Sequence, residues 1–266
     1  MTKGRAVRRI RLKAPWEIER LRAANQVVAQ VLSRLQEEMA EGITTWDLDR
    51  IAEELILKEG CRPAFKGYHG YPATTCISIN EEIVHGIPSK SRRLETGDLV
   101  SIDVGVIRQD YFGDAAFSRI VGDAGTPEAK RLLRVTKEAL YLAISRAKPK
   151  RHLGDIGEAV QRHAEAHGFG VVRQFVGHGI GTALHEPPEV PNFGKKGAGP
   201  MLKKGMVIAI EPMITLGSHE VRVLDDGWTA VTRDGSLAAH FEHTIAITAK
   251  GAEILSDGFM EPPDLD

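Results

Sequence analysis

Hydrophobic residues alternate with small or polar ones in one stretch near the middle of the chain, over 99–106. This period of two is typical of a strand with one aliphatic face. A polar turn follows at 108–110, and the chain then returns through 111–121. The pattern therefore predicts a β-hairpin. Its aliphatic face consists of Val100, Ile102, Val104 and Val106.

Apolar residues recur at helical spacing in four other stretches, which predicts helices over about 15–40, 46–58, 126–147 and 154–167. Pro15 favours the first turn of the first helix, and Thr45 is the expected cap of the second. Glycine- and proline-rich residues at 61–73 predict a loop. Further strands are expected near 76–80, 83–85, 206–215, 220–232 and 238–248.

The two halves of the chain resemble each other. Each contains two helices, then a glycine-rich stretch with a histidine, then strands that carry acidic residues. Asp103 follows Gly97 by the same spacing as Glu211 follows Gly205. The repetition predicts one α+β domain over 15–266, with a pseudo-two-fold antiparallel sheet that holds both acid-bearing hairpins and is backed by helices. A short basic arm, 1–14, precedes it.

Two aspartates interrupt the apolar hairpin. A turn centred near residues 108 and 109 places Asp103 almost opposite Asp114. Two like charges about 4 Å apart repel by about 4 kcal/mol at an effective dielectric constant of about 20. Either one carboxyl group is protonated or a cation lies between the two. The alternative is that both aspartates are solvated on an exposed face of the sheet.

Glu211 and Glu242 also lie in apolar strand sequence, where an unpaired carboxylate is costly. Four carboxylates carry a charge that two divalent cations would cancel, and a neutral imidazole would complete the ligand set. Oxygen ligands with one nitrogen suit Mn²⁺, Fe²⁺, Co²⁺ or Zn²⁺. The sequence therefore predicts a site for two divalent ions, which is a common hydrolytic arrangement. The candidate ligands are Asp103, Asp114, His178, Glu211 and Glu242.

Composition bears on nucleic-acid binding, membrane insertion, secretion and the cellular compartment. The formal net charge of −1 gives no reason to expect specific nucleic-acid binding. No apolar run reaches the ~18 residues of a membrane span, and no apolar signal core follows the basic arm. With only two cysteines, Cys61 and Cys76, the chain is expected in a reducing cytoplasm. The arm is expected to be solvated, and the alternative is transient contact with an RNA-rich surface such as a ribosome.

Nine short segments spread along most of the chain stand out: Gly67-Tyr68-His69-Gly70-Tyr71-Pro72, Cys76-Ile77-Ser78-Ile79-Asn80-Glu81, His85-Gly86-Ile87-Pro88, Ile102-Asp103-Val104, Gly113-Asp114, Gly177-His178-Gly179-Ile180-Gly181, His185-Glu186, Ile210-Glu211-Pro212-Met213 and Phe241-Glu242-His243-Thr244. They resemble the motifs of the type I, bacterial kind of methionine aminopeptidase, which has the pita-bread fold of creatinase and the aminopeptidases. No insertion like that of the type II enzymes fits between His178 and Glu211, and the arm is too short for the zinc-finger extension of eukaryotic type I forms.

The resemblance implies a role for each candidate. Asp103 would bind one metal ion, His178 and Glu211 the other, and Asp114 and Glu242 would bridge the two. Glu211 would also act as general base. His185 would hydrogen-bond the scissile amide, and His85 would contact the substrate backbone from the other side. The implied reaction is removal of the initiator methionine from nascent chains, preferentially before a small second residue.

The resemblance also assigns walls to a methionine slot. Apolar and sulfur-containing walls favour the flexible thioether side chain. Phe65 stands where the family often has a small residue, and Leu184 where an aromatic residue is common, so pocket size and rate are expected to differ. The implied wall residues are Tyr68, Tyr71, Cys76 and Trp228.

Three alternatives remain open. A pita-bread dipeptidase that cleaves before proline usually carries an additional N-terminal domain. A non-catalytic binding homologue is expected to have lost metal ligands, whereas all five are present here. A ribosome-associated role of the basic arm could coexist with peptidase activity. The protein is expected to be a monomer.

Overall fold

The computed structural model describes residues 9–122 and 124–265, and its four long helices confirm the helical periodicity of the sequence. Each helix begins and ends within a few residues of the expected bounds. Thr126 caps the third helix by accepting a hydrogen bond from the backbone N–H of Ala129. The helices are α1 (Pro15–Glu38), α2 (Thr45–Lys58), α3 (Pro127–Arg146) and α4 (Leu153–Ala166).

Nine strands form one antiparallel sheet, in the order β1-β4-β5-β14-β9-β7-β8, with β2 paired to β4 and β15 paired to β14. Two three-stranded sheets, β13-β10-β6 and β11-β12-β3, complete the fold. The strands of the large sheet are β1 (Arg62–Pro63), β2 (Thr75–Ile79), β4 (Leu99–Arg108), β5 (Tyr111–Ile120), β7 (Gly177–Gly179), β8 (Glu186–Val190), β9 (Val207–Ile210), β14 (Glu242–Ile247) and β15 (Ala252–Ile254). The small sheets contain β3 (Glu82–Val84), β6 (Gly170–Val171), β10 (Met213–Thr215), β11 (Val221–Val223), β12 (Ala230–Thr232) and β13 (Ala238–His240).

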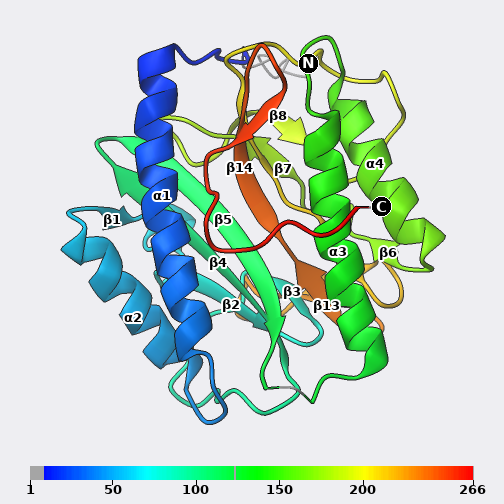
Figure 1. Ribbon diagram of the computed structural model, residues 1–266. Helices are drawn as coiled ribbons and strands as arrows, with labels where there is room; N and C mark the ends of the chain where they lie inside the picture. Colours follow the sequence, from blue (N-terminus) through cyan, green and yellow to red (C-terminus); the bar gives the residue numbers. More distant parts are fainter. Residues whose placement is uncertain (1–8, 123, 266) are drawn as a thin grey trace, which may run out of the picture.

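The expected pseudo-symmetry is present in the pairing of the strands. Strands β4 and β5 form the first acid-bearing hairpin, β9 and β14 pair in the second half, and the β5–β14 contact joins the two halves into one sheet. Helix α1 packs on β4 and β5, while α3 packs on β9, β10, β13 and β14. The prediction of one pseudo-symmetric sheet backed by helices is confirmed, and Figure 1 shows the two helix pairs flanking the strands.

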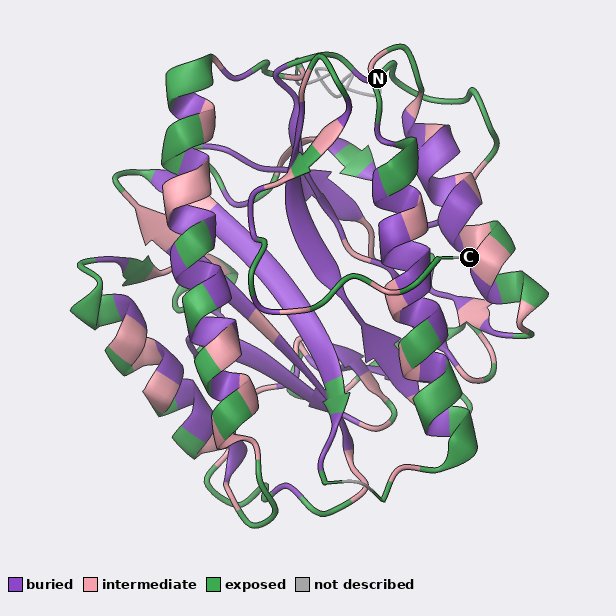
Figure 2. Ribbon diagram, in the orientation of Figure 1, coloured by how far each residue is buried: buried purple, intermediate pink, exposed green. Residues whose placement is uncertain are grey.

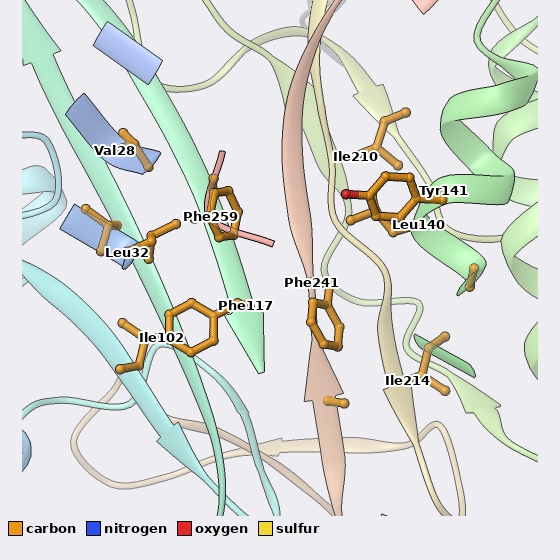
Figure 3. Close-up of a cluster of buried hydrophobic side chains, with 14 of the residues drawn as sticks. Val28, Leu32, Ile102, Phe117, Leu140, Tyr141, Ile210, Ile214, Phe241 and Phe259 are labelled. Atoms are coloured by element: carbon orange, nitrogen blue, oxygen red, sulfur yellow. The ribbon is translucent and has the colours of Figure 1, made fainter. Parts of the chain in front are cut away.

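The main core lies between the helices and the sheet. Figure 3 shows Val28 and Leu32 of α1 close to Ile102 and Phe117, and Leu140 and Tyr141 of α3 close to Ile210. Ile102 and Phe117 are direct partners across the β4–β5 hairpin. Because side chains alternate along a strand, the neighbours Asp103 and Ala116 point to the opposite face, away from the helices. Purple strands in Figure 2 mark how completely this sheet is buried.

Three local expectations need correction. Thr44, rather than Thr45, caps α2, because its hydroxyl oxygen accepts the N–H of Asp47. The 61–73 segment is not entirely loop, since it contains β1 and a short 3₁₀ turn at Tyr68–Gly70. The hairpin turn is centred one residue later than expected, at Gln109 and Asp110, both with positive φ (48° and 65°). Such a two-residue turn with two left-handed residues matches the twist of the flanking strands.

The end of the basic arm is packed against the domain, whereas the sequence predicts a solvated arm. Residues 1–8 lie outside the described residues. Lys13, expected to be solvated, is buried: its Nζ lies 2.6 Å from Glu186 Oε2, and its backbone N–H donates to the carbonyl of Gly205. Arg11 pairs with Glu17 at the start of α1. These contacts fix the end of the arm because a buried ammonium group requires a charged partner.

The tail after β15 runs between α1 and α3 (Figure 1), where Phe259 is buried. Across the described residues, no helix combines the length and apolar character needed to cross a membrane.

Candidate metal centre

Acidic side chains form a row across the large sheet, on the face away from the helices. Asp103 of β4 is the direct partner of Ala116 on β5, and Ala116 is in turn the partner of Glu242 on β14. Glu211 comes immediately after Ile210, the residue of β9 that pairs with His243 of β14. Neighbouring strands lie about 4.8 Å apart. The carboxylates of Asp103, Glu242 and Glu211 therefore lie close together on one face of the sheet, with the methyl group of Ala116 between Asp103 and Glu242.

Asp114 joins this row from a position two residues along β5. The sequence predicts that it lies almost opposite Asp103; the observed partner of Asp114 is Gly105, and that of Asp103 is Ala116. The one-residue shift of the turn makes the two aspartates diagonal rather than direct neighbours. Both still point to the same face, so the conclusion that their carboxylates meet is retained.

His178 of β7 approaches the row from the side of β9. Its Nε2 lies 3.7 Å from Asp114 Oδ2 and 3.6 Å from Glu211 Oε1. Its Nδ1 lies 3.0 Å from the backbone carbonyl of Gly179, and a proton on Nδ1 leaves the lone pair of a neutral ring on Nε2. Ligand atoms of Asp114, His178 and Glu242 all lie within 4.8 Å of one another, as a metal site requires.

Removal from water dominates the ionisation of the cluster. It raises the pKa of Asp103 to about 7 and those of Asp114, Glu211 and Glu242 well above the ordinary range, and repulsion between neighbouring acids raises the last three further. It also lowers the pKa of His178 to about 3, so the imidazole is neutral. Divalent cations would reverse the effect on the acids, because they favour carboxylates over carboxylic acids.

The residues present fit such cations. Asp103 Oδ1, Asp114 Oδ1 and Glu242 Oε1 are buried and have no hydrogen-bond partner within the part of the chain that the structure describes. A buried carboxylate oxygen without a partner costs several kcal/mol unless a cation compensates it. These oxygens come from three adjacent strands and face one space, an arrangement that fits a cation.

The acids form the floor of a cavity of about 270 Å³. Every residue that the sequence assigns to the methionine slot lines it, and so do the two residues that depart from the family pattern. Phe65, in place of a small residue, and Leu184 are both buried parts of one apolar cluster at this wall. The wall residues are Phe65, Tyr68, Tyr71, Cys76, Leu184 and Trp228.

Two more histidines face the same cavity. The ring of His185 packs edge-to-face on that of His178, with centroids 4.3 Å apart, and its Nδ1 lies 2.7 Å from the hydroxyl of Tyr68. His85 packs edge-on against Phe175 and Trp228. Burial lowers the pKa of His85 to about 4 and also lowers that of His185, so both rings are neutral near pH 7. A neutral ring can donate one hydrogen bond and accept another.

Sequence reasoning missed three residues near the acids. His240 lies two residues before Glu242; its Nε2 is buried and 3.9 Å from Glu211 Oε2. His69 lines the cavity and has a positive φ of 48°. Asn25 of α1 is fully buried, and its Oδ1 accepts the backbone N–H of Asp114. In the sequence, the signal that could have revealed this contact is an asparagine at helical spacing from the apolar residues Leu21 and Val28.

Comparisons with known proteins agree with this geometry. The sequence model described as metallopeptidase family M24 matches residues 19–249. The chain is 50% identical over 245 residues to a methionine aminopeptidase of Clostridium perfringens, covering 92% of this chain and 98% of the relative. It superposes on the crystal structure of a methionine aminopeptidase from Thermotoga maritima with a TM-score of 0.92 and 48% identity, covering 94% of this chain and all of that one. A prolidase from Pyrococcus furiosus matches with a TM-score of 0.75 and 25% identity, and the match covers 93% of this chain and 65% of the prolidase.

Proposed function

Because the chain belongs to metallopeptidase family M24, we propose that its five-residue cluster is the metal centre of an aminopeptidase that removes N-terminal methionine. The activity follows from the methionine aminopeptidases that match over nearly the whole chain. The resemblance found in the sequence, the pita-bread fold class and the assignment as a metal-dependent enzyme are all confirmed.

One observation supports the metal centre more than any other. Buried carboxylate oxygens from β4, β5 and β14 face one space without hydrogen-bond partners among the described residues. We propose that Asp103 holds one divalent ion, that His178 and Glu211 hold a second, and that Asp114 and Glu242 bridge the two. The position of Asp114 and Glu242 between Asp103 and His178 supports the bridging assignment. Mn²⁺, Fe²⁺, Co²⁺ and Zn²⁺ all suit this ligand set.

When bound, such ions lower the pKa of water toward 7 and so supply a nucleophile at neutral pH. The protein then has to move protons and hold the substrate. Glu211, in contact distance of both His178 and His240, is placed to accept the proton of the attacking water as general base and deliver it to the leaving amine.

His185 is the proposed donor to the scissile carbonyl. The hydroxyl of Tyr68 lies 2.7 Å from its Nδ1 and orients the ring at the wall of the cavity. A hydrogen bond to an oxygen that gains charge strengthens as the reaction proceeds, so this contact favours the transition state. His85, at the opposite wall beside Trp228, is the proposed contact to the substrate backbone.

The cavity supports methionine as the side chain that is bound. Its aromatic and thiol walls offer polarisable contacts to a thioether. Tyr71 is held rigidly, because its hydroxyl donates to the backbone carbonyls of Thr75 or Gly86, each 2.9 Å away. Phe65 fills space at this wall, which supports a tight slot. A preference for a small second residue is part of the proposal.

Neither the proline-specific dipeptidase nor the non-catalytic binding homologue is favoured. The prolidase matches only over part of its length and with lower identity than the methionine aminopeptidases. The chain retains all five candidate ligands and brings them together, which a non-catalytic homologue has no reason to do. We further propose that the protein acts as a monomer in the cytoplasm on nascent chains, with ribosome contact through its first residues.

The proposal is tested with a Met-Ala-Ser peptide. Asp114→Asn and Glu242→Gln keep the shape of each side chain but remove a charged ligand, so we expect methionine release to fall to the level of the chelator-treated protein. Asp110→Asn, in the exposed hairpin turn, is the matched control and should retain activity. Undiminished activity in excess chelator would overturn the metal-dependent mechanism.

A further inference from the structure

A second group of metal-ligating side chains lies between α3 and α4. Glu138 projects from α3, His163 lies in the last turn of α4, and His167 is the residue that follows the end of α4. One carboxylate oxygen and one nitrogen of each ring lie within 4.8 Å of one another. The cavity with the acidic row has no lining residue from either helix. The group is therefore separate from the candidate metal centre.

Hydrogen bonds already orient these side chains as in a metal site. Glu138 is 8% exposed; its Oε2 lies 2.8 Å from His163 Nε2, and its Oε1 accepts a hydrogen bond from Arg134 at 2.7 Å. His167 Nδ1 lies 2.9 Å from the backbone carbonyl of His163. Metal-binding histidines commonly donate their second ring N–H to such a carbonyl, and ligating carboxylates are commonly held by a further donor.

The distances match a small cation after minor adjustment. Zn²⁺ binds nitrogen and oxygen ligands at about 2.0–2.2 Å, so tetrahedral ligand atoms lie about 3.4 Å apart. Glu138 Oε2 and His163 Nε2, at 2.8 Å, are slightly closer together than this. The other pairs of candidate ligand atoms are separated by at most 4.8 Å, which is slightly farther. Ring rotations that move the nitrogens by about 1 Å close the difference. His163 and His167 are both partly exposed, so their rings have room to rotate.

We propose that Glu138, His163 and His167 bind one Zn²⁺ that links α3 to α4. Two imidazoles and one carboxylate are a ligand set that Zn²⁺ accepts, with water in the fourth position. Glu138 Oε2 and one nitrogen of each ring are the ligands, while Arg134 keeps its hydrogen bond to Oε1. The alternative is that the carboxylate, the imidazole and the guanidinium form a structural network without a metal.

Counting the zinc ions bound per chain distinguishes the Zn²⁺ site from a structural network without a metal. Protein stripped with a chelator is equilibrated at buffered free Zn²⁺ concentrations, and bound zinc is measured for the wild type, His163→Gln/His167→Gln and a control, His219→Gln, whose histidine is exposed on a loop far along the chain. We expect the double variant to bind one zinc ion fewer than the wild type and the control. Methionine release should be equal in all three, since neither histidine lines the cavity. Equal zinc stoichiometry would overturn the proposal.

A second variant and a second readout guard against a folding defect. His167→Gln alone keeps the hydrogen bond between His163 and Glu138, so α3 and α4 remain joined. Crystals of the wild type soaked in Zn²⁺ should show anomalous scattering between the helices, and crystals of His167→Gln should not. A zinc-soaked wild-type crystal with no such signal contradicts the site.

Discussion

Ala116 carries only a methyl group where its partners on both neighbouring strands carry carboxylates, Asp103 and Glu242. A larger residue would fill the space into which the acids point. The fully buried alanine is therefore as important to the centre as the acids themselves, because close packing leaves few voids that a cation can occupy. Its role is invisible in a sequence, since an alanine in a strand has no chemical signature.

At the residue scale, His185→Ala tests the assignment of a donor to the scissile carbonyl. We expect kcat for Met-Ala-Ser to fall by roughly 10²–10³-fold with a much smaller change in KM, as for the loss of one oxyanion donor. His219→Ala, with its ring outside the cavity, serves as control. A higher KM at unchanged kcat would show that His185 only binds the substrate.

At the scale of elements, helix α1 positions the proposed metal centre from behind the sheet. Asn25 accepts a hydrogen bond from the backbone N–H of Asp114. Gly113 allows α1 to approach this closely, because an added Cβ would lie 2.7 Å from backbone atoms of Ala24 and Asn25.

Each helix also needs its own cap. Asp155 accepts the N–H groups of His152, at 2.7 Å, and Gly197, at 3.1 Å, and so joins the start of α4 to a distant loop.

The backbone N–H of His152 lowers the pKa of Asp155, against the smaller opposing effect of burial. A carboxyl group with a lower pKa in the folded protein stabilises it above the ordinary pKa of 3.8, and the stabilisation is lost as the pH falls through the lower folded value. Asp155→Ala should therefore reduce the free energy of unfolding by about 1 kcal/mol at pH 7. The difference from wild type should shrink as the pH falls below 3.8. Urea titrations at several pH values measure both.

Glu158→Ala, one turn farther along α4, is the matched control, because Glu158 forms a partly exposed i,i+4 pair with Arg162 and does not cap the helix. It should cost a few tenths of a kcal/mol at most. A loss for Asp155→Ala that persists undiminished at low pH would contradict the capping role of the ionised carboxylate.

At the scale of the whole molecule, the acidic row crosses the boundary between the two halves. Asp103 and Asp114 come from the first half, Glu211 and Glu242 from the second, and the β5–β14 contact joins them. Bound cations would hold the halves together, whereas without them the acids repel each other or remain protonated. Metal binding and folding should therefore be coupled.

Metal ions should raise the melting temperature of chelator-treated protein. An ion at 100 times its dissociation constant stabilises the folded state by about 2.7 kcal/mol, which for a chain of this size corresponds to roughly 5–10 °C. With Mn²⁺ as the added ion, Asp114→Asn/Glu242→Gln should melt at a temperature that is nearly independent of metal, because the site proposed between α3 and α4 is a Zn²⁺ site. Scanning calorimetry of both proteins, with and without added ion, measures the shift. A double variant that responds as the wild type does would place the stabilising ion elsewhere.

The sequence by itself determined the helices, the alternation of the central hairpin and the identity of the acids, because these depend on neighbours a few residues apart. It could also indicate a cation, since acids of one sign in apolar strands need compensation. Only the tertiary structure decided the order of the strands, the diagonal placement of Asp103 and Asp114, the burial of Lys13 and the approach of His240 to Glu211. These depend on pairings between distant segments and on where each turn is centred, and a shift of one residue changes which side chains are direct neighbours.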